Sequence, residues 1–122
     1  RNIRSLEYIN TNNPFFVGAK PNICVVEQEL CTSYFDEIVE NLKGIEVVFY
    51  LIHSLSETKQ NYRKKDNDLA SLVAMAATKA GAKQIIYLGG FGNRDNQNTS
   101  KHLISRQETA DYLRKYHSNV TE

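Results

Sequence analysis

Two side chains that could carry acid–base and binding chemistry stand four residues apart near the C-terminal end of the sequence, in the pattern His102-x-x-x-Arg106. On an α-helix such residues share one face, so the two side chains would be neighbours. A histidine can donate or accept a proton near neutral pH. An arginine is always charged and cannot act as a base, so Arg106 would serve binding. The alternative is that His102 caps the helix and Arg106 is a solvated surface residue.

Further candidates follow directly after apolar runs of the sequence. Gly89 and Gly90 come after one such run, and His53 and Ser54 come after another. Glycine also serves the exits of strands in general, because it adopts backbone conformations that other residues avoid. A lone histidine is more often structural than catalytic, so His53 and Ser54 are predicted only as contacts.

The elements that must position these residues alternate between strands and helices. We expect strands at 2–9, 23–29, 45–55 and 85–88, a strand beginning at 120–121, and helices at 32–44, 66–81 and 100–116. The unbroken apolar run Val47–Ile52 is typical of a parallel strand covered by helices on both faces. The sequence therefore predicts a doubly wound α/β sheet. Such sheets bind ligands beyond the carboxyl ends of their strands, where the candidates above are found.

The expected helices carry their own signals. Thr32 is predicted to cap the first helix, whose exit at Gly44 tolerates a left-handed backbone. The second helix begins at Asp66 or Asn67 and is rich in alanine between Leu69 and Ala80. Its apolar surface extends almost around the helix, which predicts burial on two sides. We also consider a homodimer contact through this alanine-rich helix, with ordinary packing on the sheet as the alternative.

Composition excludes several classes of protein. The 122 residues suit one domain, and the net charge of +1 argues against a nucleic-acid partner. The basic run 63–65 is followed by acidic residues, so we interpret it as a solvated beginning of a helix. No apolar run approaches the roughly 20 residues that span a bilayer. Cys24 and Cys31 have no partners at metal-ligand spacing, and two cysteines favour a reducing compartment, so a cytoplasmic location is expected.

An ordered set of segments resembles the NAD(P)-binding domain of the atypical short-chain dehydrogenase/reductase family, specifically its NmrA-like branch. The segments are IRSLEY, VVEQEL, LKGIEVVFYLIHSL, AGAKQIIYLGG and HLISRQETADYLR, at 3–8, 25–30, 42–55, 80–90 and 102–114. The resemblance implies a Rossmann-like sheet, NAD or NADP as cofactor, and an oxidoreductase or epimerase-like reaction on a small carbonyl or sugar-like substrate.

The resemblance also implies roles for particular residues. Glu29 would meet the adenine amino group and Leu30 would pack on the adenine ring. Tyr8 would lie near the adenosine ribose, where it is neither the acidic residue that favours NAD nor the arginine that favours NADP. His102 and Arg106 stand where the family usually has Tyr-x-x-x-Lys, with Arg106 available for a cofactor phosphate or ribose. The remaining contacts with the dinucleotide would be Ile52, His53, Ser54, Gly89 and Gly90.

One family feature has no counterpart in the sequence. The Gly-rich turn that places the cofactor pyrophosphate at a helix N-terminus is missing, because nothing before Gly89 resembles it. We therefore expect 1–122 to be a partial NAD(P)-binding Rossmann domain that lacks the first strand and its turn, which a longer chain or another segment would supply. Two alternatives stay open: a non-catalytic, dinucleotide-sensing regulatory module, and a subunit that uses this fold only for assembly.

Overall fold

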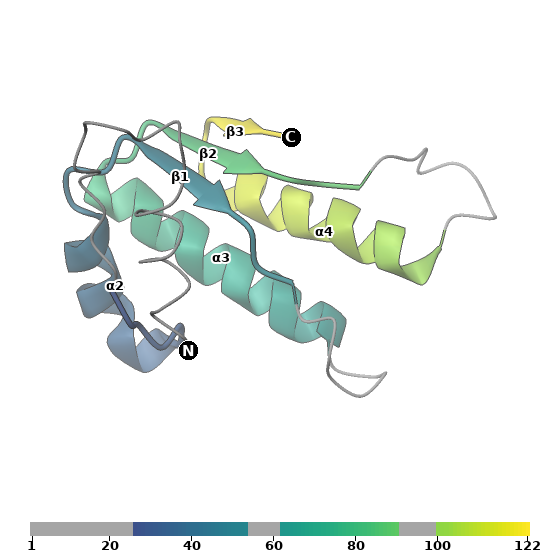
Figure 1. Cartoon of the computed structure of the whole chain (residues 1–122), viewed down its shortest axis with the longest axis horizontal. Coiled ribbons are helices and arrows are strands. Elements are labelled where there is room, and N and C mark those ends of the chain that lie inside the picture. Colours follow the sequence, from purple (N-terminus) through teal and green to yellow (C-terminus); the bar gives the residue numbers. More distant parts are fainter. Residues whose placement is uncertain (1–25, 54–61, 91–99) are drawn as a thin grey trace, which may run out of the picture.

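The computed structural model describes residues 26–53, 62–90 and 100–122, and it shows an α/β arrangement with a parallel, open sheet (Figure 1). The elements are η2 (Thr32–Tyr34), α2 (Phe35–Leu42), β1 (Val47–Tyr50), α3 (Tyr62–Ala80), β2 (Gln84–Tyr87), α4 (Lys101–Tyr116) and β3 (Val120–Thr121). The expected strand at 2–9 with Tyr8, and the predicted contact Ser54, lie outside the described residues. The α/β class predicted from the alternation of elements is thus confirmed.

The three strands follow one another in space as they do in sequence. Their order is β1-β2-β3, and both neighbouring pairs are parallel. Tyr50 lies opposite Tyr87, and Ile85 lies opposite Val120. Parallel neighbours need a crossover connection, which α3 provides between β1 and β2 and α4 between β2 and β3.

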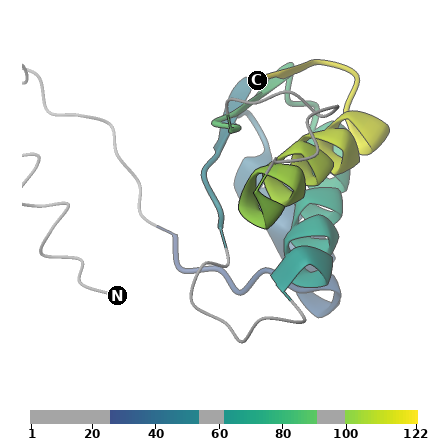
Figure 2. The ribbon, with the colours of Figure 1, turned by 90° about the vertical axis from the view of Figure 1, so that its right-hand side faces the viewer.

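The described helices lie on one face of this sheet (Figure 2). Tyr50 and Tyr87 point to that face and are buried among residues of α3 and α4. The opposite face is apolar and exposed, with Phe49 65%, Leu51 63% and Leu88 69% accessible. The expectation of helices on both faces is therefore not met within the described residues. An apolar strand pattern indicates that a face can be buried, but it does not say which segment covers it.

The alanine-rich helix α3 is the centre of the packing. Ala70, Ala74, Ala76 and Ala77 are completely buried. Some of these alanines pack against the sheet and α4, and others pack against α2. Burial on two sides, predicted from the sequence, is confirmed. Because these alanines are used within the chain, a homodimer would need other residues of this helix.

Helix ends differ from the sequence prediction in part. Thr32 does not cap α2: it begins the short turn η2, and no side chain caps either element. Gly44 has φ +79°, as the predicted left-handed exit requires. Ser100 caps α4, because its Oγ accepts a hydrogen bond from the Leu103 amide at 3.3 Å.

The second helix begins earlier than predicted. It starts at Tyr62 rather than at Asp66 or Asn67, and Asp66 is buried on its inner side. The guanidinium of Arg63 donates two hydrogen bonds to the carboxylate of Glu108 in α4. The distance between Nε of Arg63 and Oε2 of Glu108 is 3.0 Å. This ion pair joins the first turn of α3 to the middle of α4. The expected strand at 23–29 is also wrong for its described part, since 26–29 form no strand.

The turn at the amino edge of the sheet is held by a buried histidine. His117 follows α4, and its Nε2 donates to the carbonyl oxygen of Ala82 at 2.9 Å.

None of the helices in the described ranges is long and apolar enough to cross a membrane.

We expect the packing of α4 on the core to dominate its stability. Leu113 is fully buried, whereas Ile104 of the same helix is 37% accessible. Leu113→Ala should lower the free energy of unfolding by about 2–5 kcal/mol, because it removes buried methyl groups and leaves a cavity. Ile104→Ala should cost less than about 1 kcal/mol. Urea denaturation of the two variants measures the difference, and equal losses would contradict this packing.

Candidate functional site

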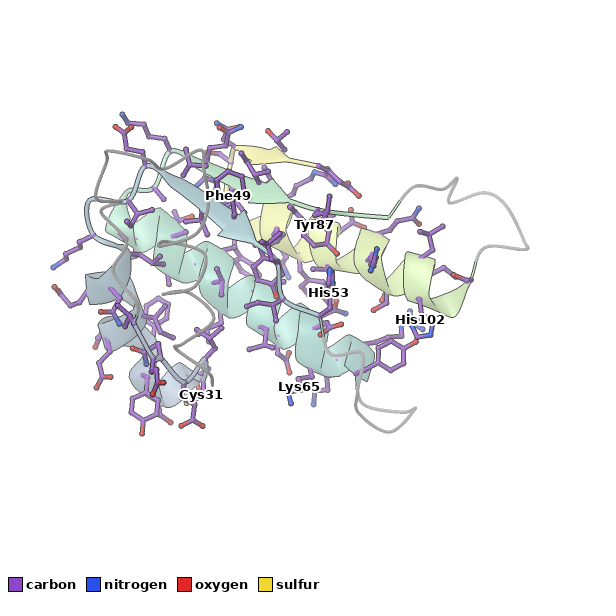
Figure 3. All side chains as sticks on the ribbon, in the orientation of Figure 1. Cys31, Phe49, His53, Lys65, Tyr87 and His102 are labelled. Carbon is purple, nitrogen blue, oxygen red and sulfur yellow. The ribbon has the colours of Figure 1, made fainter. Side chains whose placement is uncertain are left out.

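The carboxyl ends of β1 and β2 meet at one edge of the sheet, and several predicted site residues lie there. His53 follows β1, and Gly89 and Gly90 follow β2. Figure 3 shows His53 beside Tyr87, with His102 on the neighbouring helix α4. The ring centroids of His53 and Tyr87 are 6.3 Å apart. Ligands of parallel α/β sheets bind at this edge, so it is the first place to examine.

The two glycines allow a close approach of the chain segments. A Cβ atom at Gly90 would collide with the side chain of Leu103 and would lie 3.2 Å from Cδ of Arg106. A Cβ atom at Gly89 would occupy the position of the Glu122 carboxylate. A side chain at Gly90 would therefore require Leu103 to move, and one at Gly89 would require the Glu122 side chain to move. The glycines allow these close contacts whether or not a dinucleotide lies against them.

The structure contradicts the alternative in which His102 caps the helix and Arg106 is a solvated surface residue. His102 is exposed and does not cap the helix, because Ser100 does. Its ring stacks on that of Tyr62 at the start of α3, with centroids 5.8 Å apart and planes 29° apart. Arg106 is half-buried rather than solvated. The two residues thus occupy one side of α4, at the carboxyl edge of the sheet.

A buried aromatic pair lies beneath this edge. Tyr50 and Tyr87 contact each other edge to face, with ring centroids 5.9 Å apart. Burial, and next the negative charge of Asp66, raise the pKa of Tyr50 well above its usual range. Burial also raises the pKa of Tyr87, and the positive charge of Arg106 opposes part of that rise. Both tyrosines are 2% accessible, so they are part of the core beneath the site.

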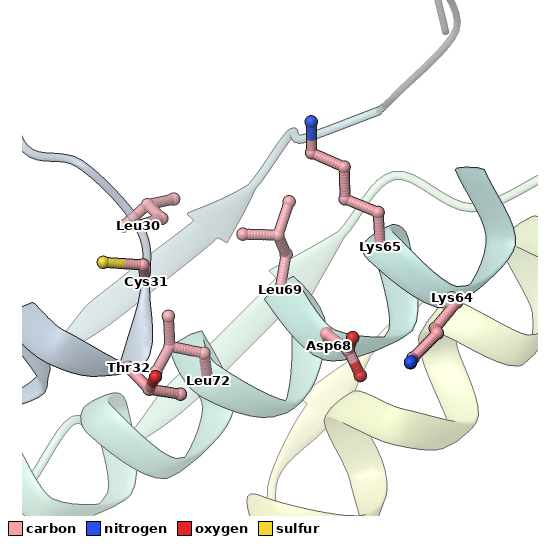
Figure 4. A pocket seen from close by; sticks show the side chains of 8 residues that line it. All are labelled: Leu30, Cys31, Thr32, Lys64, Lys65, Asp68, Leu69 and Leu72. Atoms are coloured by element: carbon pink, nitrogen blue, oxygen red, sulfur yellow. The ribbon is translucent and has the colours of Figure 1, made fainter. Parts of the chain in front are cut away.

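A pocket opens between the segment before α2 and the first half of α3 (Figure 4). Its volume is about 490 Å³, within the usual range for small-molecule sites. Apolar side chains and polar groups both line it: Leu30, Cys31, Thr32, Lys64, Lys65, Asp68, Leu69 and Leu72. Leu30, the residue predicted to pack on adenine, is among them. Glu29, predicted to meet the adenine amino group, is exposed next to the pocket and does not line it.

Most of the pocket lining was missed by the sequence prediction. Lys64 and Lys65 were interpreted as part of a solvated beginning of a helix, and Leu69 as part of the apolar surface of that helix. With the helix beginning at Tyr62, Lys65, Leu69 and Leu72 are spaced i, i+4 and i+7 on one face. A correct prediction of where this helix begins would therefore have placed these three residues on one face.

The remaining candidates are placed as follows. Ile52 is half-buried and packs against the core cluster that contains Tyr50. Arg106, His53, Gly89 and Gly90 gather near Tyr87, whereas Leu30 lies in the pocket. Among the residues that the structure describes, no group of three or more histidines, cysteines, aspartates or glutamates could hold a metal ion.

Comparison with known proteins adds no relative. No protein-family model matches the chain, and neither a curated protein nor a solved structure matches it. Function must therefore be argued from the geometry of the carboxyl edge and from the resemblance noted in the sequence.

We expect the stack between Tyr62 and His102 to be visible in solution. A histidine ring above an aromatic face is shielded, so Tyr62→Leu should move the His102 ring-proton NMR signals downfield. Tyr34→Leu is the matched control, because Tyr34 is an exposed tyrosine of another element. Unchanged His102 signals in Tyr62→Leu would show that the two rings do not stack.

The buried Tyr50 hydroxyl should make the protein sensitive to alkali. Its folded-state pKa is raised, whereas an unfolded tyrosine titrates near about 10. The stabilisation is present below that value and is lost as the pH rises through the folded-state pKa, since the unfolded chain ionises first. Urea unfolding above about pH 10 should therefore show a steep loss of stability, and a shallower loss in Tyr50→Phe.

Two controls make the alkaline experiment specific. Tyr34→Phe removes an exposed hydroxyl and should leave the alkaline slope unchanged. The Tyr50 hydroxyl has no hydrogen-bond partner in the described part of the chain, so Tyr50→Phe should fold normally at neutral pH. Identical slopes for Tyr50→Phe and the parent protein would contradict the assignment.

Proposed function

We propose that this chain forms part of an NAD(P)-binding, Rossmann-like domain of the atypical short-chain dehydrogenase/reductase type, which lies in the cytoplasm. The observation that carries the proposal is the pocket between the segment that contains Leu30 and the first half of α3. Helix α3 follows the carboxyl end of β1, and parallel α/β sheets bind their ligands beyond the carboxyl ends of their strands. The uncovered apolar face of β1 and β2 supports a doubly wound sheet, since helices of such a sheet cover both faces. A first strand with a Gly-rich turn, which the resemblance implies, would complete that sheet.

The adenosine half of the cofactor would occupy the pocket. Leu30 and Leu69 supply apolar lining that an adenine ring could pack against, and the Thr32 hydroxyl can hydrogen-bond to the nucleoside. Lys64 and Lys65 bring positive charge to the same pocket, where cofactor phosphates would lie. The exposed carboxylate of Glu29 can accept a hydrogen bond from the adenine amino group.

The nicotinamide half would extend along the carboxyl edge, past His53, Gly89 and Gly90. Bound there, the reduced cofactor would supply a hydride for the carbonyl carbon of a small carbonyl or sugar-like substrate. The exposed imidazole of His102 would donate the proton that the carbonyl oxygen needs, so that the products would be the oxidised cofactor and the alcohol.

A second candidate is a non-catalytic module that senses the dinucleotide and regulates a partner. The stack of His102 on Tyr62 favours it, because this stack gives the histidine a structural role between α3 and α4. The tyrosine that the family uses in catalysis is also replaced at this position by His102. Binding would then be retained without turnover.

Titration of the full-length protein with NADH and NADPH tests the proposal. We expect saturable binding that Leu69→Trp weakens at least about tenfold, because the larger ring fills the pocket. Met75→Trp is the control, since Met75 is an exposed residue of the same helix. Absence of binding by the parent protein, or equal binding by Leu69→Trp, would refute the proposed site.

Turnover then separates the two candidates. Oxidation of NADH or NADPH that depends on an added carbonyl compound, and that is lost in His102→Ala, supports the enzyme. Binding without turnover, and unaltered in His102→Ala, supports the sensor.

A further inference from the structure

The arginines of the described residues differ in their partners. Arg63 is paired with Glu108, and Arg114 is paired with Glu122 at 2.9 Å. Arg106 is half-buried, yet within 26–53, 62–90 and 100–122 no carboxylate forms an ion pair with it. A guanidinium that is partly removed from water loses hydration, and an ion pair normally compensates for that loss.

The surroundings of Arg106 keep its charge at the carboxyl edge. Its Cδ lies near Gly90, 3.2 Å from where a Cβ atom of that residue would be, and its positive charge acts on the hydroxyl of Tyr87. Two carboxylates also act on that hydroxyl, but Glu122 is paired with Arg114, and Asp66 is buried on α3 with an interaction of its own. Neither forms an ion pair with Arg106 within the described residues. His102, one helical turn away, is exposed beside it.

We infer that Arg106 is an anion-binding residue and that the carboxyl edge accepts a ligand whose carboxylate or phosphate meets this guanidinium. The planar guanidinium can donate two parallel hydrogen bonds to either group. Two sources of the anion are consistent with this chemistry: a cofactor phosphate, or the carboxylate of a substrate such as a 2-oxo acid. The identity of that source rests on the proposed function, whereas anion binding itself does not.

The experiment uses the full-length protein and follows the Arg106 Nε–Hε signal by NMR. Inorganic phosphate, pyruvate and NADH are added separately, and methyl pyruvate serves as the neutral analogue of pyruvate. We expect the signal to move with at least one anion and to stay unchanged with methyl pyruvate. A response to pyruvate assigns the anion to the substrate, and a response to NADH and phosphate alone assigns it to the cofactor.

Variants give the second measurement. Arg106→Met should weaken binding of the responding anion at least tenfold, and Arg106→Lys, which keeps the charge but not the planar fork, should weaken it less. Arg114→Met, on the same helix, should bind like the parent protein because its guanidinium is already paired. If no anion moves the Arg106 signal, or if Arg106→Met binds normally, the inference is wrong. Anion binding without NADH binding would refute the proposed function alone.

Discussion

The close packing of α3 between the sheet, α2 and α4 is the constraint on which the rest of the structure depends. Fully buried alanines, such as Ala74 and Ala76, allow neighbouring elements to approach this helix on more than one side. Their small side chains leave room for Tyr50 and Tyr87, which fill the space between the strands and the helices. Because α3 is held on several sides, its first half has a defined position beside the carboxyl edge. The pocket and the stack of Tyr62 on His102 both depend on that position.

Much of the fold could be predicted from the sequence, because its signals are local and repeated. The apolar runs that become β1 and β2, the alanine pattern of α3 and the left-handed exit at Gly44 were all recognisable. The beginning of α3 was not recognisable; its first turn carries Arg63, which pairs with Glu108, 45 positions away. No local pattern in the sequence encodes such a contact. The cap expected at Thr32 was wrong because a short 3-10 turn precedes α2.

The location of the candidate site could be predicted from the sequence, but the contacts among its residues could not. The rule that ligands bind beyond the carboxyl ends of parallel strands led to His53, Gly89 and Gly90, and these residues do lie at one edge. The pocket beside Leu30 needed the true helix start. The stack of His102 on Tyr62 needed the relative placement of α3 and α4, which spacing along one helix does not determine. Their roles toward a dinucleotide remain proposals that rest on resemblance and geometry together.

The most direct test of a dinucleotide at the carboxyl edge is a map of backbone amide NMR shifts in the full-length protein during titration with NADH. The account predicts that shifts concentrate at Leu30, Thr32 and Leu69, which line the pocket, and continue through His53 to Gly89. Shifts confined to the exposed sheet face around Phe49 and Leu88, or no shifts at all, would contradict it.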